Sequence, residues 1–131
     1  MATRFLATEE APIRREIKEH MASAAVDERS TTVVMSQLSN ATRVFKNPIA
    51  IKINETLDDP DADFSKIAEF ATGQRTKAMW QETGAFDAAM WSCGQSVGLI
   101  HDVPTCKVLV ERIVAEAEQQ LATGARCVSK L

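Results

Sequence analysis

The chain has 131 residues, a net charge of −3, 45% hydrophobic residues and only 5% aromatic residues, with no tyrosine. This length suits one domain and falls well short of the ~250 residues of a complete eight-stranded α/β barrel. Without a basic surface or aromatic stacking platforms, no nucleic-acid partner is expected. No apolar run reaches the ~20 residues needed to cross a bilayer, so no membrane partner is expected either. We expect a soluble, mildly acidic protein that is cytoplasmic unless a targeting signal directs it elsewhere.

Three cysteines, Cys93, Cys106 and Cys127, are scattered along the chain. No two of them have the spacing of a zinc ligand pair, and the nearest histidine, His101, has no second partner at ligand spacing. Three thiols are also too few for a disulfide framework. We therefore expect reduced thiols that pack as small hydrophobic side chains, and no metal site.

The first elements expected are a short strand at residues 3–7 and a helix that starts near Thr8. Two acids and Pro12 in the first turn favour a helix N-terminus, because negative charge there meets the helix dipole and that position needs no N–H donor. Apolar residues then repeat at helical spacing along one face. They are Ile13, Ile17, Met21 and Ala24.

A β-hairpin and a second helix are expected next. Residues 30–35 are β-branched and should be extended, pairing with residues 42–45 beyond Asn40. Asn47 and Pro48 then mark the end of the expected strand, and proline suits the first turn of a helix. The apolar positions of that helix are Ile49, Ile53 and Leu57.

The rest of the chain is expected to be helical. The pattern predicts helices near residues 62–73 and 78–84, a segment capped at its start over residues 88–99, and a longest helix between Pro104 and Gly124. The apolar face of the longest helix comprises Cys106, Leu109, Val110, Ile113, Val114, Ala117 and Leu121. The fold class expected from these elements is mostly α with a short N-terminal strand.

Ala2, Thr3 and Arg4 are the first candidates for a ligand site. They stand where the expected strand meets the expected helix. Free backbone N–H groups and the positive end of a helix converge at such a junction and bind phosphate. Taken alone the pattern is weak, since most such residues lie on an ordinary surface.

Gly94, Gln95 and Gly98 form the second candidate site. Two glycines four residues apart leave one face of a helix without side chains, so that another backbone or a flat ring can approach closely. The amide of Gln95 beside that gap can both donate and accept hydrogen bonds. Tight helix packing is the alternative explanation of the two glycines.

The carboxyl end carries a candidate targeting signal. Ser129, Lys130 and Leu131 form the tripeptide that the peroxisomal import receptor recognises. An accidental ending is the alternative, because the motif is short. We expect a peroxisomal location and this receptor as a partner, with residues 1–128 forming the domain and residues 129–131 the targeting tail.

Three blocks of the sequence resemble one enzyme family. They are Thr-Arg-Phe-Leu-Ala-Thr-Glu-Glu-Ala-Pro, Thr-Arg-Val-Phe-Lys-Asn and Gly-Gln-Ser-Val-Gly-Leu-Ile-His-Asp-Val-Pro. Their order is similar to that in the carboxy-terminal part of the FMN-dependent nitronate monooxygenases. More loosely, the chain resembles the flavin-type enoyl-acyl-carrier-protein reductases.

The resemblance implies a carboxy-terminal fragment of an FMN-binding α/β (TIM) barrel, with the last barrel strand followed by a helical lid. The implied activity is oxidation of alkyl nitronates, the small-molecule substrates, by molecular oxygen. Ala2 and Thr3 fall where the family holds the FMN phosphate, with alanine in place of a glycine. Gly94 and Gln95 fall where the lid covers the flavin.

No catalytic residue follows from the resemblance. Neither His20 nor His101 occupies the position of the family's catalytic histidine. Two other functions stay open: a non-catalytic helical remnant, and an interaction module that completes another chain carrying the other barrel strands. Because an open strand edge invites association, a homo-oligomer is also expected.

Overall fold

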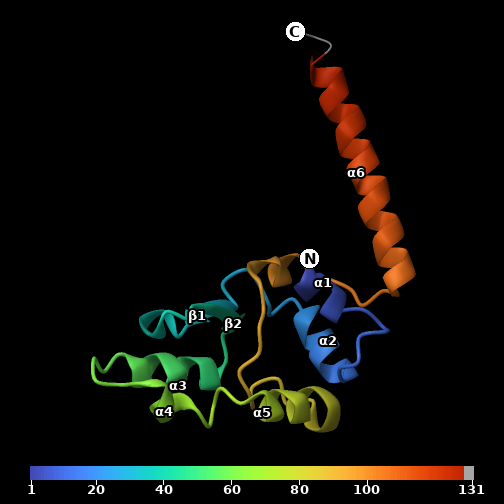
Figure 1. The fold of residues 1–131 in the computed structure, drawn as a ribbon. Coiled ribbons are helices and arrows are strands. Elements are labelled where there is room, and N and C mark those ends of the chain that lie inside the picture. Colours follow the sequence, from blue (N-terminus) through green and yellow to red (C-terminus); the bar gives the residue numbers. More distant parts are fainter. Residues whose placement is uncertain (129–131) are drawn as a thin grey trace.

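The computed structural model describes residues 1–128, so the predicted targeting residues 129–131 lie outside the described part of the chain. The elements form a compact body from which one long helix projects (Figure 1). In chain order they are α1 (Ala2–Leu6), α2 (Arg15–Met21), β1 (Thr31–Val34), the 3₁₀-helix η1 (Ser36–Leu38), β2 (Thr42–Phe45), α3 (Pro48–Leu57), α4 (Phe64–Ile67), α5 (Gly73–Ala78), the π-helical turn η2 (Met79–Thr83), the 3₁₀-helix η3 (Gln95–Leu99) and α6 (Cys106–Val128).

The hairpin expected between residues 30 and 45 is confirmed. β1 and β2 pair antiparallel, with Thr31 opposite Phe45 and Val34 opposite Thr42. A distant segment extends this sheet, because Val44 forms an antiparallel bridge with Ser92. Residues 91–93 therefore lie along β2 like a short third strand.

Asn47 and Pro48 start α3 as the sequence predicts. The Asn47 side chain accepts a hydrogen bond from the Ala50 N–H at 2.9 Å, which caps the helix, and Pro48 occupies its first turn. The buried face of α3 packs on the hairpin and on α4 in one apolar cluster. The buried members of this cluster are Val34, Met35, Val44, Ala50, Ile53, Leu57, Ile67 and Phe70.

A second apolar cluster lies on the other side of β2 and joins it to α2. Phe45 stacks on Trp91 with ring centroids 4.8 Å apart, and the Trp91 indole N–H donates to the Phe86 carbonyl at 2.9 Å. The buried members are Ala7, Ile13, Ile17, Met21, Val26, Phe45, Met79, Ala89, Trp91, Cys93, Val97 and Ile100. This cluster positions residues 91–94 beside α1, which sets the geometry of the candidate site.

α6 projects from the body and touches it near its first turns (Figure 1). Leu109, which is 4% exposed, is the buried residue among the described side chains of this helix. Asp102, just before the helix, joins the Arg4 guanidinium at 2.5 Å and also bonds to Arg112. None of the helices in residues 1–128 combines the length and apolarity that a bilayer crossing requires.

The N-terminal strand expected at residues 3–7 is wrong: residues 3–6 belong to the helix α1, and Ala7 follows its end. The N–H of Arg4 donates to the Met1 carbonyl at 3.0 Å, which closes the first turn. A strand is stable only when a neighbour satisfies its backbone groups, and none lies beside these residues in the described part of the chain. The open strand edge on which a homo-oligomer was expected is therefore absent at this position.

The other corrections concern helix boundaries. The helix expected from Thr8 is α2, and residues before it form turns. The helix expected over residues 62–73 shortens to α4. The segment expected over 88–99 is not helical until η3 begins, and Ser92 within it bridges to β2. Conversely, α6 continues past Gly124 instead of ending there.

Candidate functional site

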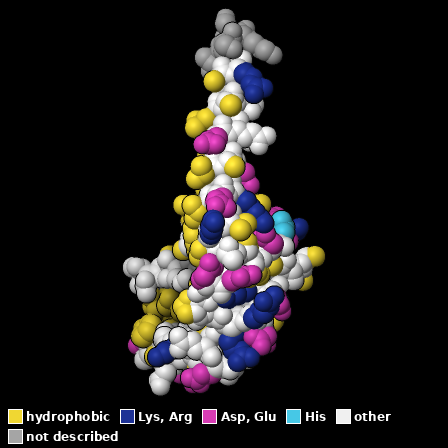
Figure 2. Space-filling view, turned by 90° about the vertical axis from the view of Figure 1, so that its right-hand side faces the viewer, with side chains coloured by type: hydrophobic (Ala, Val, Ile, Leu, Met, Phe, Trp, Pro, Cys, Tyr) yellow, Lys and Arg dark blue, Asp and Glu magenta, His cyan; other side chains and the backbone are white. Residues whose placement is uncertain are grey.

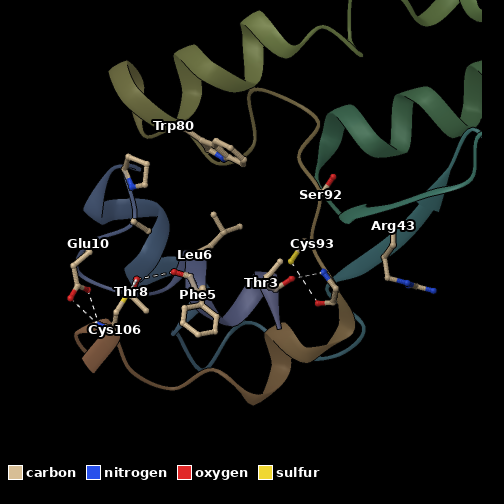
Figure 3. Close-up of a pocket in the computed structure, with 14 residues that line it drawn as sticks. Thr3, Phe5, Leu6, Thr8, Glu10, Arg43, Trp80, Ser92, Cys93 and Cys106 are labelled. Atoms are coloured by element: carbon tan, nitrogen blue, oxygen red, sulfur yellow. Dashed lines mark hydrogen bonds between the residues drawn. The ribbon is translucent and has the colours of Figure 1, made fainter. Parts of the chain in front are cut away.

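The candidate site is a pocket of about 740 Å³ between α1, the turn after it, the 92–94 segment and the start of α6 (Figure 3). Most of its walls are apolar, as is usual for small-molecule sites. The lining residues are Ala2, Thr3, Phe5, Leu6, Thr8, Glu10, Ala11, Pro12, Arg43, Trp80, Ser92, Cys93, Gly94 and Cys106.

Three of the four residues that the resemblance assigned to the cofactor line this pocket together. Ala2 and Thr3 occupy the first turn of α1, and Gly94 lies against them although it is 91 positions from Thr3. The Gly94 N–H donates to the Thr3 hydroxyl oxygen at 3.0 Å. A Cβ atom at Gly94 would lie 3.3 Å from that oxygen, so a side chain there would press on the contact.

Gln95 is not among the pocket's lining residues. It begins η3, on the far side of Gly94. Gly98 has a packing role, because a Cβ there would come within 2.4 Å of the Glu28 backbone nitrogen. Of the two explanations for the glycine pair, the structure therefore supports close packing at Gly98 and a place in the pocket wall at Gly94.

Two thiols, of Cys93 and Cys106, and the carboxylate of Glu10 line the pocket. Burial raises the pKa of the Cys93 thiol to about 12, so this side chain is a neutral thiol near pH 7 and a poor nucleophile. The Cys106 thiol lies 3.4 Å from the Thr8 hydroxyl oxygen. Both Glu10 carboxylate oxygens accept from the Cys106 N–H, at 3.0 and 2.8 Å, and this bond lowers the pKa of Glu10.

Two residues from distant elements also line the pocket: Trp80 in η2, and Arg43 on β2, whose side chain points away from the other labelled residues (Figure 3). The Arg43 guanidinium donates to the Thr31 hydroxyl at 3.0 Å and is the cationic group among the lining residues. The Trp80 indole nitrogen is buried and, within residues 1–128, has no hydrogen-bond partner. Neither residue was among the predicted site residues, because no local pattern links β2 or η2 to α1.

Neither histidine belongs to the pocket lining. His20 stacks on Phe86 with ring centroids 3.5 Å apart, and burial lowers its pKa. His101 is exposed in the link before α6. Among the described residues no cluster of three His, Cys, Asp or Glu side chains is arranged to hold a metal ion. Among the lining residues Glu10 is the one carboxylate, and the Cys106 N–H donates to it.

Comparison with known proteins gives one consistent likeness. No family model matches the chain. Among solved structures it is similar to FabK from Thermotoga maritima, at 27% identity and a TM-score of 0.77, with 92% of this chain matched to 37% of that one. A point mutant of FabK from the same organism matches at 26% identity and a TM-score of 0.70, covering 92% of this chain and 34% of that one.

The chain thus spans about a third of the length of the FabK chains it matches. The likeness extends over nearly all of the described residues, and it supports the expectation that the chain has the fold of part of a barrel oxidoreductase. It fits the looser of the two resemblances, to flavin-type enoyl reductases, and does not support nitronate monooxygenase specifically.

Proposed function

We propose that this chain forms the phosphate side of an FMN site in a flavin-dependent oxidoreductase of the FabK type. FabK is an enoyl-acyl-carrier-protein reductase, a flavin-dependent enzyme on a TIM barrel. The observation that carries the proposal is the meeting of Ala2, Thr3 and Gly94 in one pocket wall, within a fold similar to FabK over 92% of this chain.

The start of α1 has the properties of a phosphate site in a barrel enzyme. Such barrels commonly bind phosphate at the N-terminus of a short extra helix after the last strands, and α1 is a helix of five residues. The first N–H groups of a helix have no partner within it, so those of Ala2 and Thr3 remain available to a ligand. The Thr3 hydroxyl accepts from Gly94 and so keeps its own proton to donate.

The remaining walls suit the rest of a flavin. An apolar slot bordered by Phe5, Leu6 and Trp80 can exclude water from a flat ring. Bound FMN would supply hydride transfer, while the residues of this chain bind and orient it.

Two substrate classes remain within the proposal. The likeness to FabK favours reduction of an enoyl thioester. Oxidation of an alkyl nitronate by oxygen is the second candidate, because the three sequence blocks resemble nitronate monooxygenases more specifically. Both need a general acid or base, which the proposal assigns to residues outside this chain.

A chimaera tests the proposal. The matched third of Thermotoga FabK is replaced by this chain, and flavin content is measured by visible absorbance, with activity assayed on an enoyl thioester and on a nitronate. We expect bound FMN. Thr3→Val should weaken FMN about tenfold, the effect of one lost hydrogen bond to a charged group, and leave riboflavin binding unchanged.

Gln95→Ala is the matched control, because Gln95 is adjacent to the site and outside the pocket lining. We expect it to leave FMN binding unchanged. A folded chimaera without flavin, or a Thr3→Val variant that loses riboflavin as much as FMN, would contradict the proposal.

Peroxisomal import is a separate proposal that rests on Ser129, Lys130 and Leu131 alone. A fluorescent protein fused ahead of residue 1 should enter peroxisomes, and deletion of the three residues should leave it in the cytosol. Equal distribution of the two fusions would show that the tripeptide does not act as a signal.

A further inference from the structure

Four aromatic rings from three parts of the chain pack together, and one of them is titratable. His20, in the last turn of α2, stacks on Phe86 with ring centroids 3.5 Å apart and ring planes at 12°. It also meets Phe45 of β2 edge to face, with centroids 5.5 Å apart. Phe45 stacks in turn on Trp91. These four rings, the aromatic cluster, therefore connect α2 to residues 91–94 of the pocket wall.

Phe86 is the residue through which the aromatic cluster holds that wall. Its backbone carbonyl accepts two hydrogen bonds, from the Trp91 indole N–H at 2.9 Å and from the Asn47 side-chain amide at 3.1 Å. Three residues after Trp91, the Gly94 N–H donates to the Thr3 hydroxyl oxygen at 3.0 Å. A displacement of Phe86 would therefore move the Trp91 side chain and, through the short segment that follows, the contact between Gly94 and Thr3.

Protonation of His20 opposes this packing. The imidazole is half-buried, and burial lowers its pKa from the usual 6.5, while the negative charge of Asp87 acts in the opposite direction. The packed arrangement therefore favours the neutral ring. It is fully stable above about pH 6.5 and becomes less stable as pH falls from there through the folded-state pKa.

The charged residues on the elements around His20 are exposed. Asp87 follows Phe86, Lys46 follows Phe45 on β2, and Glu16 lies one turn earlier on α2, paired with Arg14. Water screens all of these charges, so the burial of the ring decides the direction of its pKa. On the face of the body seen in Figure 2, acidic and basic side chains are interspersed, so that face adds no field of a single sign.

We propose that His20 is a positioning residue for the candidate site. Its neutral imidazole holds Phe86 in place, and a gained proton loosens residues 91–94 and weakens FMN binding against them. The proposal adds control by pH to the proposed function and rests on that function for the identity of the ligand. The coupling between His20 and the wall rests on the contacts of this chain alone.

The first test is an NMR titration of the full chain from pH 8 to pH 5. The chain has two histidines and two tryptophans, so substitution can assign their signals. We expect the Trp91 indole N–H and Gly94 N–H signals to move with the midpoint of the His20 ring signals, below about pH 6.5. In His20→Phe, which keeps a flat ring on Phe86 and removes the titrating group, neither should move over that range.

His101→Gln is the matched control, because His101 is exposed in the link before α6. We expect it to titrate at Trp91 and Gly94 as wild type does. Trp91 and Gly94 signals that do not follow the His20 midpoint would overturn the proposal, as would signals that still titrate in His20→Phe. The wild-type titration decides the coupling even where His20→Phe does not fold.

The second test is the FMN affinity of the FabK chimaera with and without His20→Phe. A phosphate group itself titrates near pH 6, so the two chimaeras are compared at each pH. We expect equal affinities at pH 8, and at pH 5.5 about threefold weaker binding by the chimaera that retains His20.

Equal FMN affinities of the two chimaeras at pH 5.5 would overturn the proposal. Failure of both to bind FMN at pH 8, together with the expected NMR titration, would refute the proposed function and leave the positioning role of His20 intact.

Discussion

The body of the molecule and α6 are stabilised in different ways. The body buries two apolar clusters that join segments far apart in the chain, such as Phe45 and Trp91. α6 contributes Leu109 to burial and otherwise depends on its own backbone hydrogen bonds, its cap and the ion pairs of Asp102. Mutations of equal size should therefore have very unequal effects in the two regions.

The largest difference is expected between a core residue and an exposed residue of α6. Trp91 is 2% exposed and stacks on Phe45, so Trp91→Ala should lower the free energy of unfolding by about 3–5 kcal/mol. Val114→Ala on α6 should change it by less than about 0.5 kcal/mol. Urea unfolding followed by circular dichroism measures both. Similar losses in the two variants would refute the division into body and projecting helix.

Two glycines of the body, Gly98 and Gly73, differ in the space around them. Gly98→Ala would place a Cβ 2.4 Å from the Glu28 backbone nitrogen, and we expect a loss of about 1–3 kcal/mol from the forced shift. Gly73→Ala is the control, since nothing lies within 4 Å of its Cβ position. The midpoint of thermal unfolding should fall for the first variant and not for the second. Equal unfolding midpoints for the two variants would show that the backbone around Gly98 can shift to accept a Cβ atom at little cost.

Gly124→Ala should stabilise α6 without affecting the body. The glycine lies inside the helix with nothing within 4 Å, so alanine should add about 0.5–1 kcal/mol of local helix stability. Hydrogen exchange should slow in the second half of α6 and stay constant in β1 and β2. Slower exchange throughout the protein would mean that α6 unfolds together with the body.

A small effect is expected at the ion pairs that anchor α6. Hydrogen bonding to Arg112 lowers the pKa of Asp102, and the nearby Arg4 charge adds to this. Because the folded-state pKa lies below the unfolded value, the contribution is present above about pH 4 and is lost as pH falls through the folded pKa. Asp102 is 44% exposed, so Asp102→Asn should cost less than about 1 kcal/mol at pH 7.

The measurement is hydrogen exchange at the start of α6 in both proteins at pH 7 and, rate-corrected, at pH 3. Wild type should approach the behaviour of Asp102→Asn as pH falls. A difference between them that persists undiminished at pH 3 would contradict the role of the charged carboxylate.

The sequence predicted best those elements whose cause is local. Asn47 and Pro48 set the start of α3 because capping and a missing N–H act within one turn. The β-branched run before residue 35 predicted the hairpin, and apolar spacing predicted α6. The predicted end of α6 at Gly124 was wrong, because a lone glycine weakens a helix without ending it.

The candidate site was partly predictable. Thr3 and Gly94 were named from family-like blocks, but nothing in either block indicates that one hydroxyl and one N–H meet at 3.0 Å. Arg43 stood in a family-like block without being named as a site residue, and Trp80 had no sequence signal, since each reaches the pocket from an element that other contacts position.

By itself, therefore, the sequence determined the capped helix α3, the hairpin and the amphipathic character of α6, because short-range backbone and side-chain preferences act within a few residues. Only the tertiary structure decided that residues 3–6 are helical and that residues 91–93 are extended. The first have no strand to pair with among the described residues, and the second pair with β2, where Phe45 N–H donates to the Trp91 carbonyl at 3.1 Å. Those long-range hydrogen bonds, absent from any local pattern, also bring the two halves of the candidate site together.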